Sequence, residues 1–259
     1  MTPAPAVTAS VAGVVDDLDL EPIGLDELVG RAGLMTRVDR KYVVPLARAR
    51  ELLRHVPPST RLLEIDGRRD LGYLSTYLDT PDLSSYLAAG RSRRRRWKVR
   101  TRSYLDTGTS FLEVKTTVAR GQSQKVRIGL APATHGPLTA DGTEFVASVL
   151  DLGTALALRP VLTTTYRRST LFLPSSGTRA TVDVALGWQS LQHDGSLRRP
   201  GLAVIETKTG ATPSEVDRLL WTHGHRPVRI SKYGLGMAAL QPGLPPLKWF
   251  RVLHRDLGC

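Results

Sequence analysis

The sequence predicts a mainly β protein of the α+β class, built on an antiparallel sheet with helices at its periphery. At least six segments place charged and apolar residues at alternate positions, which is typical of strands with one charged and one apolar face. Successive segments of this kind lie between residues 91 and 128 with short turns between them, and this spacing predicts an antiparallel meander. The 23 glycines and 17 prolines fit a fold with many turns.

The N-terminal half is predicted to alternate helices with strands. Residues 1–24 lack the basic start of a signal peptide, and we expect them to form a flexible leader. Helices are predicted over 25–32, before Gly33; over 45–55, between Pro45 and Pro57; and over 82–90, where Asp82 or Ser84 can cap the first turn. Alternation predicts strands over 35–44, 61–65, 71–79, 91–102, 111–117 and 122–128, with a hairpin turn at Gly67 between the second and third.

The C-terminal half continues the same pattern. Apolar periodicity predicts a helix over 143–150, and long alternating runs predict strands over 160–173, 179–188 and 201–209. Pro213 is expected to begin a helix that carries Glu215 and Asp217 near its N-terminus, where acidic side chains are favourable. Residues 230–240 are expected to end in a short helix, and the Pro-rich residues 241–259 to form a tail without regular structure. We therefore predict one domain over residues 25–240.

The most unusual stretch of the sequence is the basic run from Arg91 to Arg102. In an extended strand, side chains at every second position share a face. One face of this strand then carries Arg94, Arg96, Lys98, Arg100 and Arg102, and the other carries Trp97, Val99 and Thr101. With 36 basic and 24 acidic residues the chain has a net charge of +12, which favours a polyanionic partner: nucleic acid, an anionic membrane or a phosphate-rich small molecule.

Cysteine usage and hydropathy narrow the class of protein. Cys259 is the single cysteine, so neither a disulfide within the chain nor a zinc site built on cysteines is expected. No run approaches the roughly 18 consecutive apolar residues that a membrane-spanning helix needs. These features predict a cytoplasmic protein.

Carboxylates are interleaved with the cations on other predicted strands. Residues two or four apart that share a strand face include Glu113 with Lys115, Lys125 with Arg127, Tyr166 with Arg168, Arg179 with Asp183, and Glu206 with Lys208. These charged faces either point to solvent, as in an ordinary surface sheet, or converge inside a closed barrel. Burial costs several kcal/mol per ion unless the ion is paired or liganded, and a polyphosphate with a divalent metal would satisfy both signs of charge.

Short motifs along the chain resemble the VTC domain, the polyphosphate polymerase domain of the vacuolar transporter chaperone family, within the triphosphate tunnel metalloenzyme (CYTH-like) superfamily. In order they read RVDRKYVV, YLDTPDLSSYL, RRRRWKVRTRSY, FLEVKT, KVRI, YRRSTL, RATVDV, VIETKT and SKYGLG. The superfamily pattern Glu-x-Glu-x-Lys falls on Arg37, Asp39 and Lys41. The first carboxylate is thus a cation here, which is similar to VTC domains.

The resemblance implies a closed eight-stranded antiparallel β-barrel tunnel that transfers the γ-phosphate of ATP to a growing polyphosphate chain with Mn or Mg. The residues implied as catalytic, through contacts with the reacting phosphates, are Lys98, Arg100, Arg102, Lys115, Arg168 and Arg179. Further triphosphate contacts are implied at Lys41, Arg96, Lys125, Arg127, Lys208 and Lys232. Glu206 is the implied metal ligand, and Glu113 is either a second one or a partner for a neighbouring arginine. A separate membrane protein stays open as a partner, and it would place the chain peripherally at a membrane.

Other functions compete with the polymerase. Water as the acceptor would make the same site a triphosphatase or polyphosphatase. A module that binds polyphosphate or inositol phosphates without turnover is a further alternative, favoured if Glu206 lies far from the cations. A nucleic-acid-binding barrel has the charge in its favour, but it needs exposed aromatic residues between the cations, where this sequence has carboxylates. Nucleic acid is therefore the least expected partner.

Overall fold

The computed structural model describes residues 13–15, 17–32, 38–117, 123–131, 136–150 and 157–259. The chain divides into two compact units. Unit 1 comprises Met1–Leu71, Thr165–Leu186 and Arg199–Val228, and unit 2 comprises Gly72–Thr164, Gly187–Arg198 and Arg229–Cys259. The sequence predicts a single domain over residues 25–240 because it contains no internal repeat and no strong linker, and that assignment stays a prediction.

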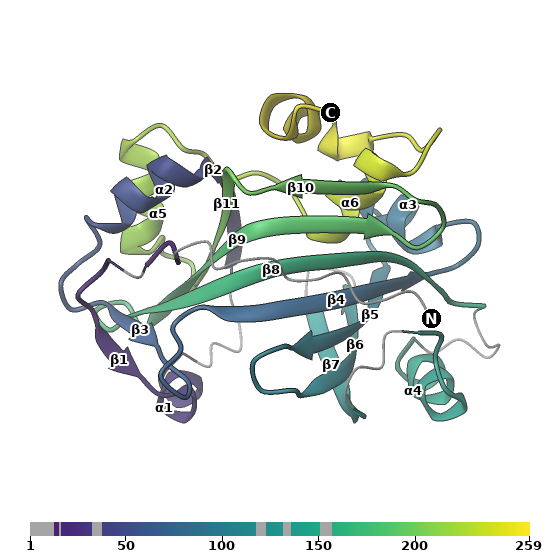
Figure 1. Ribbon diagram of the computed structural model, residues 1–259, viewed down its shortest axis with the longest axis horizontal. Helices are drawn as coiled ribbons and strands as arrows, with labels where there is room; N and C mark the ends of the chain where they lie inside the picture. The colour runs from purple at the N-terminus through teal and green to yellow at the C-terminus, as the bar shows by residue number, and fades with distance from the viewer. Residues whose placement is uncertain (1–12, 16, 33–37, 118–122, 132–135, 151–156) are drawn as a thin grey trace. The chain divides into compact units, whose positions relative to one another are not determined.

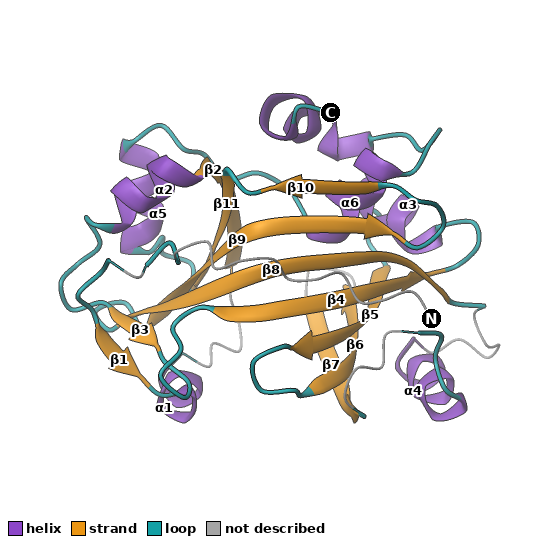
Figure 2. Cartoon of the chain, in the orientation of Figure 1, coloured by secondary structure: helices purple, strands orange, loops and turns teal. Residues whose placement is uncertain are grey.

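The described residues form a mainly antiparallel 11-stranded sheet with peripheral helices, as predicted (Figures 1 and 2). The strands are β1 (Glu21–Ile23), β2 (Val38–Pro45), β3 (Arg61–Leu63), β4 (Leu71–Asp79), β5 (Arg96–Tyr104), β6 (Ser110–Thr117), β7 (Ser123–Leu130), β8 (Arg159–Leu173), β9 (Thr178–Ser190), β10 (Ser196–Arg199) and β11 (Leu202–Thr209). Their order along the main path is β2-β11-β9-β8-β4-β5-β6-β7. Between the described parts of β2 and β7 no hydrogen bonds close this path, so the closed eight-stranded tunnel stays a prediction.

Short helices surround the strands. They are α1 (Leu25–Arg31), α2 (Leu46–Leu53), α3 (Ser84–Gly90), α4 (Ala140–Leu150), α5 (Glu215–Thr222), α6 (Lys232–Leu240) and α7 (Phe250–Val252). Helix α5 begins with a capping box in which Ser214 and Asp217 satisfy each other's backbone N–H groups. None of the helices within the described ranges has both the length and the apolar character that crossing a bilayer requires.

Unit 1 has its core on the apolar face of β2, β11 and β9. Tyr42 and Val44 lie on the same face of β2, and both are buried against α2 and α5, which lie together in Figure 1. Val14 and Val15 add to this core, and Glu21–Ile23 pairs in parallel with β3. The described part of the predicted leader is therefore ordered, because its apolar side chains fill the space beside these helices.

Unit 2 contains the predicted meander of β4, β5, β6 and β7. Val99, Leu112 and Val114 lie on one face of this meander and pack against Val146 of α4. The opposite face carries the charged residues. Alternation along each strand therefore separates a hydrophobic core from a polar face, as the sequence predicts.

Two local predictions are wrong. Gly67 does lie in a tight turn, between the bridged residues Ile65 and Arg68, but β3 then pairs with β1 and β8 rather than with β4. The Pro-rich tail is also ordered as helical turns over Leu247–Trp249, Phe250–Val252 and Leu253–Leu257. Trp249 is buried, and its ring centroid lies 5.0 Å from that of Tyr86. Apolar anchoring by residues distant in sequence decides both structures.

Candidate functional site

The strand register of unit 2 gathers the predicted phosphate ligands on one face of the meander. Residues directly opposite each other on neighbouring strands point to the same side of a sheet. The first row consists of Tyr77, Arg100, Glu113 and Arg127, and the next consists of Lys98, Lys115 and Lys125. Arg96 and Arg102 share this face through their parity on β5. The face was predicted from alternation, and the register confirms it.

Glu113 lies at the centre of this face and is 1% exposed. Its Oε2 atom accepts hydrogen bonds from Nε and Nη2 of Arg100 at 2.8 and 2.6 Å, and its Oε1 atom accepts one from Lys125 at 3.2 Å. Arg102 lies 3.9 Å from Oε2. We call these four residues the meander cluster. Glu113 is observed as the partner of cations, which is one of the two roles that the sequence left open.

The electrostatics of the meander cluster favour an added anion. Burial disfavours ionised Glu113, but the charges of Arg100, Arg102 and Lys125 outweigh burial and hold the pKa of the carboxyl well below its usual range. One permanent negative charge then faces three positive ones. The side chains of Arg100 and Lys125 are 22% and 46% exposed, so an anion from solvent can reach both. The cluster can hold phosphate oxygens by charge-assisted hydrogen bonds.

Aromatic rings support the arginines of this face. Arg100 donates a hydrogen bond to the hydroxyl of Tyr77 at 3.2 Å, and Arg102 lies over the ring of Tyr73 at 5.6 Å from its centroid. No role for these two tyrosines is predicted from the sequence. Their positions four residues apart on β4 give them the same parity, and this is the signal that places them on one face of the strand.

A second group of charges lies in unit 1, on β2 and β11. Nζ of Lys41 and Nζ of Lys208 each lie 3.1 Å from Oε1 of Glu206. We call these three residues the β2–β11 cluster. Lys41 is directly opposite Glu206, while Lys208 is directly opposite Arg179 on β9. The cluster therefore joins residues that are 165 positions apart in the sequence.

Glu206 and Lys208 of this cluster both have lowered pKa values, but the physical causes differ. The pKa of Glu206 lies well below its usual value, since Lys208, Lys41 and Arg168 outweigh the effect of burial. Burial lowers the pKa of Lys208 to about 8, and Glu206 only partly opposes this shift. The buried Nζ of Lys208 is ion-paired with Oε1 of Glu206 at 3.1 Å, an oxygen that it shares with Lys41. An ammonium group has three N–H donors, so this single contact leaves donors of Lys208 for an added anion.

Arg168 and Asp183 form a third polar contact in unit 1. Nε and Nη2 of Arg168 donate to the two carboxylate oxygens of Asp183 at 2.6 and 2.8 Å, and Asp183 is fully buried. This bidentate geometry fixes the plane of the guanidinium group. Asp183 therefore fixes the position of the Arg168 guanidinium group.

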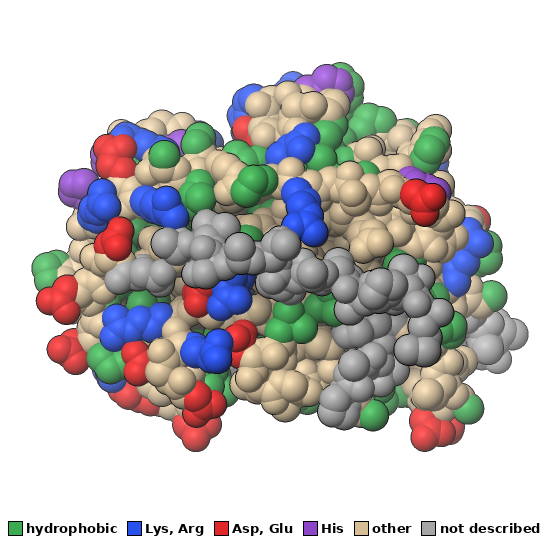
Figure 3. Space-filling model, in the orientation of Figure 1, with side chains coloured by type: hydrophobic (Ala, Val, Ile, Leu, Met, Phe, Trp, Pro, Cys, Tyr) green, Lys and Arg blue, Asp and Glu red, His purple; other side chains and the backbone are tan. Residues whose placement is uncertain are grey.

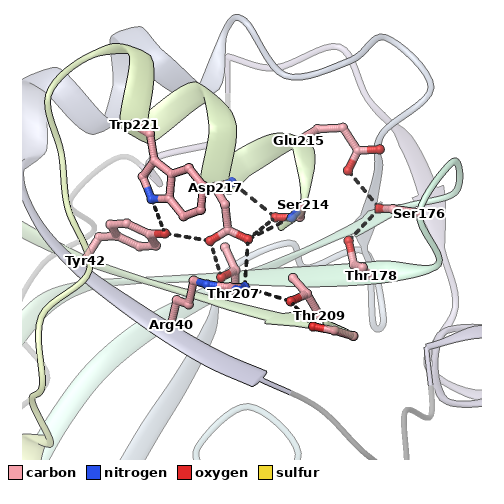
Figure 4. Close-up of polar contacts among 11 residues, drawn as sticks. Arg40, Tyr42, Ser176, Thr178, Thr207, Thr209, Ser214, Glu215, Asp217 and Trp221 are labelled. Carbon is pink, nitrogen blue, oxygen red and sulfur yellow. Dashed lines mark hydrogen bonds and ion pairs between the residues drawn. The ribbon is translucent and has the colours of Figure 1, made fainter. Parts of the chain in front are cut away.

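A buried network behind the β2–β11 cluster was not predicted (Figure 4). Oδ1 of Asp217 accepts hydrogen bonds from Tyr42 and Thr207, both at 2.6 Å, and Oδ2 accepts from Ser214. Tyr42 and Thr207 directly follow Lys41 and Glu206, so their side chains lie on the opposite face of the strands. The network therefore ties α5 to the back of the two strands that carry the cluster. The Ser214-x-x-Asp217 spacing is the sequence signal that marks it.

Two predicted contacts lie apart from the clusters. Lys232 is the first residue of α6, and its carbonyl oxygen accepts a hydrogen bond from Trp188 at 2.9 Å. Arg96 donates to the carbonyl oxygen of Arg93 at 2.8 Å, at the beginning of β5. Arg37 lies outside the described residues. The predicted phosphate contacts thus fall on one strand face in each unit, with Lys232 on a helix.

The carboxylates present a limited set of metal ligands. Within the part of the chain that the structure describes, no three His, Cys, Asp or Glu side chains form a group that could hold a metal ion. Both lysines of the β2–β11 cluster contact Oε1 of Glu206, and Oε2 takes no part in these two ion pairs. That oxygen fits a Mg ion which takes its other ligands from phosphate and water, as Mg commonly does.

Residues 36–241 match the VTC domain family, which covers most of the chain. The chain belongs to the VTC domain family. A comparison of this VTC domain with curated proteins gave no match.

Several solved structures are similar to this VTC domain at low sequence identity. HpAC1 from Hippeastrum, a candidate adenylyl cyclase described with a dominant triphosphatase activity, is 15% identical, with a TM-score of 0.45 over 82% of this chain and 99% of that one. The PH1819 protein from Pyrococcus horikoshii is 13% identical, with a TM-score of 0.42 over 76% and 96%. A candidate adenylate cyclase from Vibrio parahaemolyticus is 13% identical, with a TM-score of 0.39 over 72% and 86%.

Proposed function

We propose that this VTC domain binds the triphosphate of ATP and transfers its γ-phosphate to a growing polyphosphate chain. The observation that carries the proposal is the β2–β11 cluster, in which the ammonium groups of Lys41 and Lys208 both lie 3.1 Å from one carboxylate oxygen of Glu206. Two buried or half-buried cations that share one carboxylate keep a net positive charge, and an added anion would offset it. Family membership supports phosphate as that anion.

The chemistry needs no protein nucleophile. A terminal oxygen of the polyphosphate chain attacks the γ-phosphorus in line, a new P–O bond forms, and the bond to the β–γ bridging oxygen breaks, so that ADP leaves. Negative charge spreads over the equatorial oxygens during transfer, and preorganised cations stabilise it. We assign this role to Lys98, Arg100, Arg102, Lys115, Arg168 and Arg179. Lys41, Arg96, Lys125, Arg127, Lys208 and Lys232 are assigned to binding of the phosphate chain.

The carboxylates hold these cations in place. Glu113 orients Arg100 and Lys125, and Asp183 orients Arg168, so that the donors are positioned before phosphate arrives. Glu206 would hold a Mn or Mg ion through Oε2. When bound, such an ion would neutralise phosphate charge and help to orient the triphosphate. Glu113 is less suited to a metal, because Arg100 and Lys125 already occupy both of its oxygens.

The proposal is tested by incubating the purified protein with ATP and Mn, then separating the products by gel electrophoresis. Phosphate chains that lengthen with time, together with release of ADP, are the expected result. ADP and free phosphate without chains would instead indicate a triphosphatase. Binding of tripolyphosphate without any turnover would indicate a binding module.

A matched pair of variants connects the activity to the site. Lys208→Met removes the ammonium group and keeps an apolar stem, and we expect turnover to fall by at least about tenfold, the loss of one charge-assisted contact. Arg218→Ala removes an exposed cation from α5 and should leave turnover unchanged. Equal turnover in Lys208→Met and in wild type would contradict the assignment.

A further inference from the structure

A group of cations surrounds the C-terminal end of α3 in unit 2. The backbone N–H groups of Arg91 and Arg93 donate to the carbonyl oxygens of Leu87 and Ala88, both at 2.9 Å. Nζ of Lys248, from the C-terminal helical turns, donates to the carbonyl oxygen of Ala89. Cations are favourable at a helix C-terminus, where unpaired carbonyl groups carry partial negative charge. This explains why the turn and Lys248 meet there.

The number of cations exceeds what the end of one helix requires. We define the α3 patch as Arg91, Arg93, Arg94, Arg95, Arg96, Arg229 and Lys248. The side chains from Arg91 to Arg95 are exposed, and Arg96 and Arg229 are close enough to Lys248 to lower its pKa, together with burial of that lysine. The backbone turns sharply at Ser92, which has a φ of 55°, a region that side-chain-bearing residues seldom adopt.

Carboxylates do not balance the α3 patch. Across the described ranges, none of its seven residues forms an ion pair with Asp or Glu. Elsewhere the surface differs: Arg48 pairs with Glu51 on α2, and Figure 3 shows basic and acidic side chains together over α2 and α5. Like charges that crowd without a counter-charge raise the local potential and attract anions.

Arg96 links the α3 patch to the charged face of the meander. It lies on the same side of β5 as Lys98, Arg100 and Arg102, with successive members about 7 Å apart along the strand. Cations at such spacing can contact several phosphates of one linear chain. The segment from Arg91 to Arg96 contains no aromatic side chain on which a nucleic-acid base could stack.

We propose that the α3 patch binds linear polyphosphate. It would contact phosphates that lie beyond those bound by the charged face of the meander. This proposal rests on the proposed function and adds a site to it. It requires that long chains bind more tightly than tripolyphosphate, which is too short to occupy both the strand face and the patch. It also requires that the additional affinity falls steeply with salt, as for other exposed phosphate contacts.

The test compares two double variants of the full chain. Arg94→Ala/Arg95→Ala removes two exposed cations of the patch that take no part in the assigned strand-face contacts. Arg218→Ala/Arg226→Ala removes two exposed cations of unit 1 and serves as the control for net charge. Binding of tripolyphosphate and of a long polyphosphate of narrow length distribution is measured by calorimetry at several salt concentrations. Thermal unfolding checks that both variants fold.

The patch variant should bind long polyphosphate about tenfold more weakly than wild type, with a salt slope reduced by roughly 1 to 2, while its tripolyphosphate affinity is unchanged. The control variant should resemble wild type in both. Equal losses in the two variants would overturn the patch as a site, and so would tighter binding of a single-stranded oligonucleotide than of polyphosphate. Failure of wild type to bind tripolyphosphate would instead overturn the proposed function.

Discussion

Arg100 and Glu113 lie directly opposite each other on β5 and β6, and Oε2 of Glu113 accepts hydrogen bonds from both Nε and Nη2 of Arg100. The other oxygen, Oε1, accepts from Lys125 on β7. A single buried carboxylate therefore holds cations from two neighbouring strands at once. Since one negative charge cannot neutralise them, the group stays positive and can bind a further anion.

Removing the charge of Glu113 should destabilise the free protein more than the protein with bound phosphate. Glu113→Gln leaves Arg100, Arg102 and Lys125 together without their counter-ion, which we expect to cost about 2 kcal/mol in the free energy of unfolding. Tripolyphosphate would replace the lost charge, because a ligand that binds the folded state stabilises it. The rise in Tm on adding tripolyphosphate should be larger for Glu113→Gln than for wild type. An equal or smaller rise would mean that the carboxylate does not compete with phosphate for these cations.

Low pH should lower the free energy of unfolding by protonating Glu113 and Glu206. The pKa values of Glu113 and Glu206 lie below the ordinary value of 4.5, so the folded chain holds fewer protons than the unfolded chain at low pH. Their contribution is present in full above the unfolded pKa and is lost as the pH falls toward the folded pKa. Urea unfolding between pH 7 and pH 3 should show a loss of stability that begins near pH 4.5. The loss should be smaller in Glu206→Gln, and an identical decline in this variant would contradict the assignment.

Raising the pH above the pKa of Lys208 should stabilise the free protein and weaken its binding of phosphate. The pKa of Lys208 is about 8 in the folded chain, against an ordinary value of 10.5. Between these values the unfolded chain binds more protons, so this group makes the free protein more stable as the pH rises through that range. Phosphate binding should weaken over the same range, because the neutral amine lacks the charge that attracts an anion.

Affinity for tripolyphosphate measured from pH 7 to pH 10 would check this prediction. Lys208→Met should have weaker affinity at pH 7 and a flatter dependence on pH. Parallel curves for wild type and variant would show that another group is responsible.

The network around Asp217 should be essential for the stability of unit 1. Asp217→Asn replaces one accepting oxygen with a donor that faces the hydroxyl and N–H donors of Tyr42, Thr207 and Ser214. We expect a loss of about 2–4 kcal/mol in the free energy of unfolding, measured by urea denaturation. Glu215→Gln on the same helix is the control, since Glu215 accepts from the hydroxyl groups of Ser175 and Ser176 near the surface, and it should cost less than about 1 kcal/mol. Similar losses in both variants would contradict a special role for Asp217.

Alternation made the strand faces predictable. The parity of Lys98, Arg100 and Arg102 places them on one side of any strand, and the register of β5 and β6 agrees with that expectation. Local signals also located most helices, including α5, whose Ser214 cap lies one residue after Pro213, the start that the sequence predicts. These predictions succeeded because they depend only on neighbours in the sequence.

Partners that are distant in the sequence could not be predicted in the same way. The turn at Gly67 indicated a hairpin, but Leu62 pairs with Leu171 on β8 instead. The Pro-rich tail has weak local preferences, and burial of Trp249 orders it. Tertiary packing overrides local preference in both places.

The sequence by itself determined the charge of the chain, the alternation of its strands and the order of motifs that places it in the VTC domain family. Only the tertiary structure decided that Glu113 is held by Arg100 and Lys125, that Glu206 lies between Lys41 and Lys208, and that Lys248 joins the arginines at the end of α3. The physical reason is that a strand pattern sets the face on which a side chain lies, whereas the ion that it meets depends on the register between strands and on the packing of helices brought together by folding.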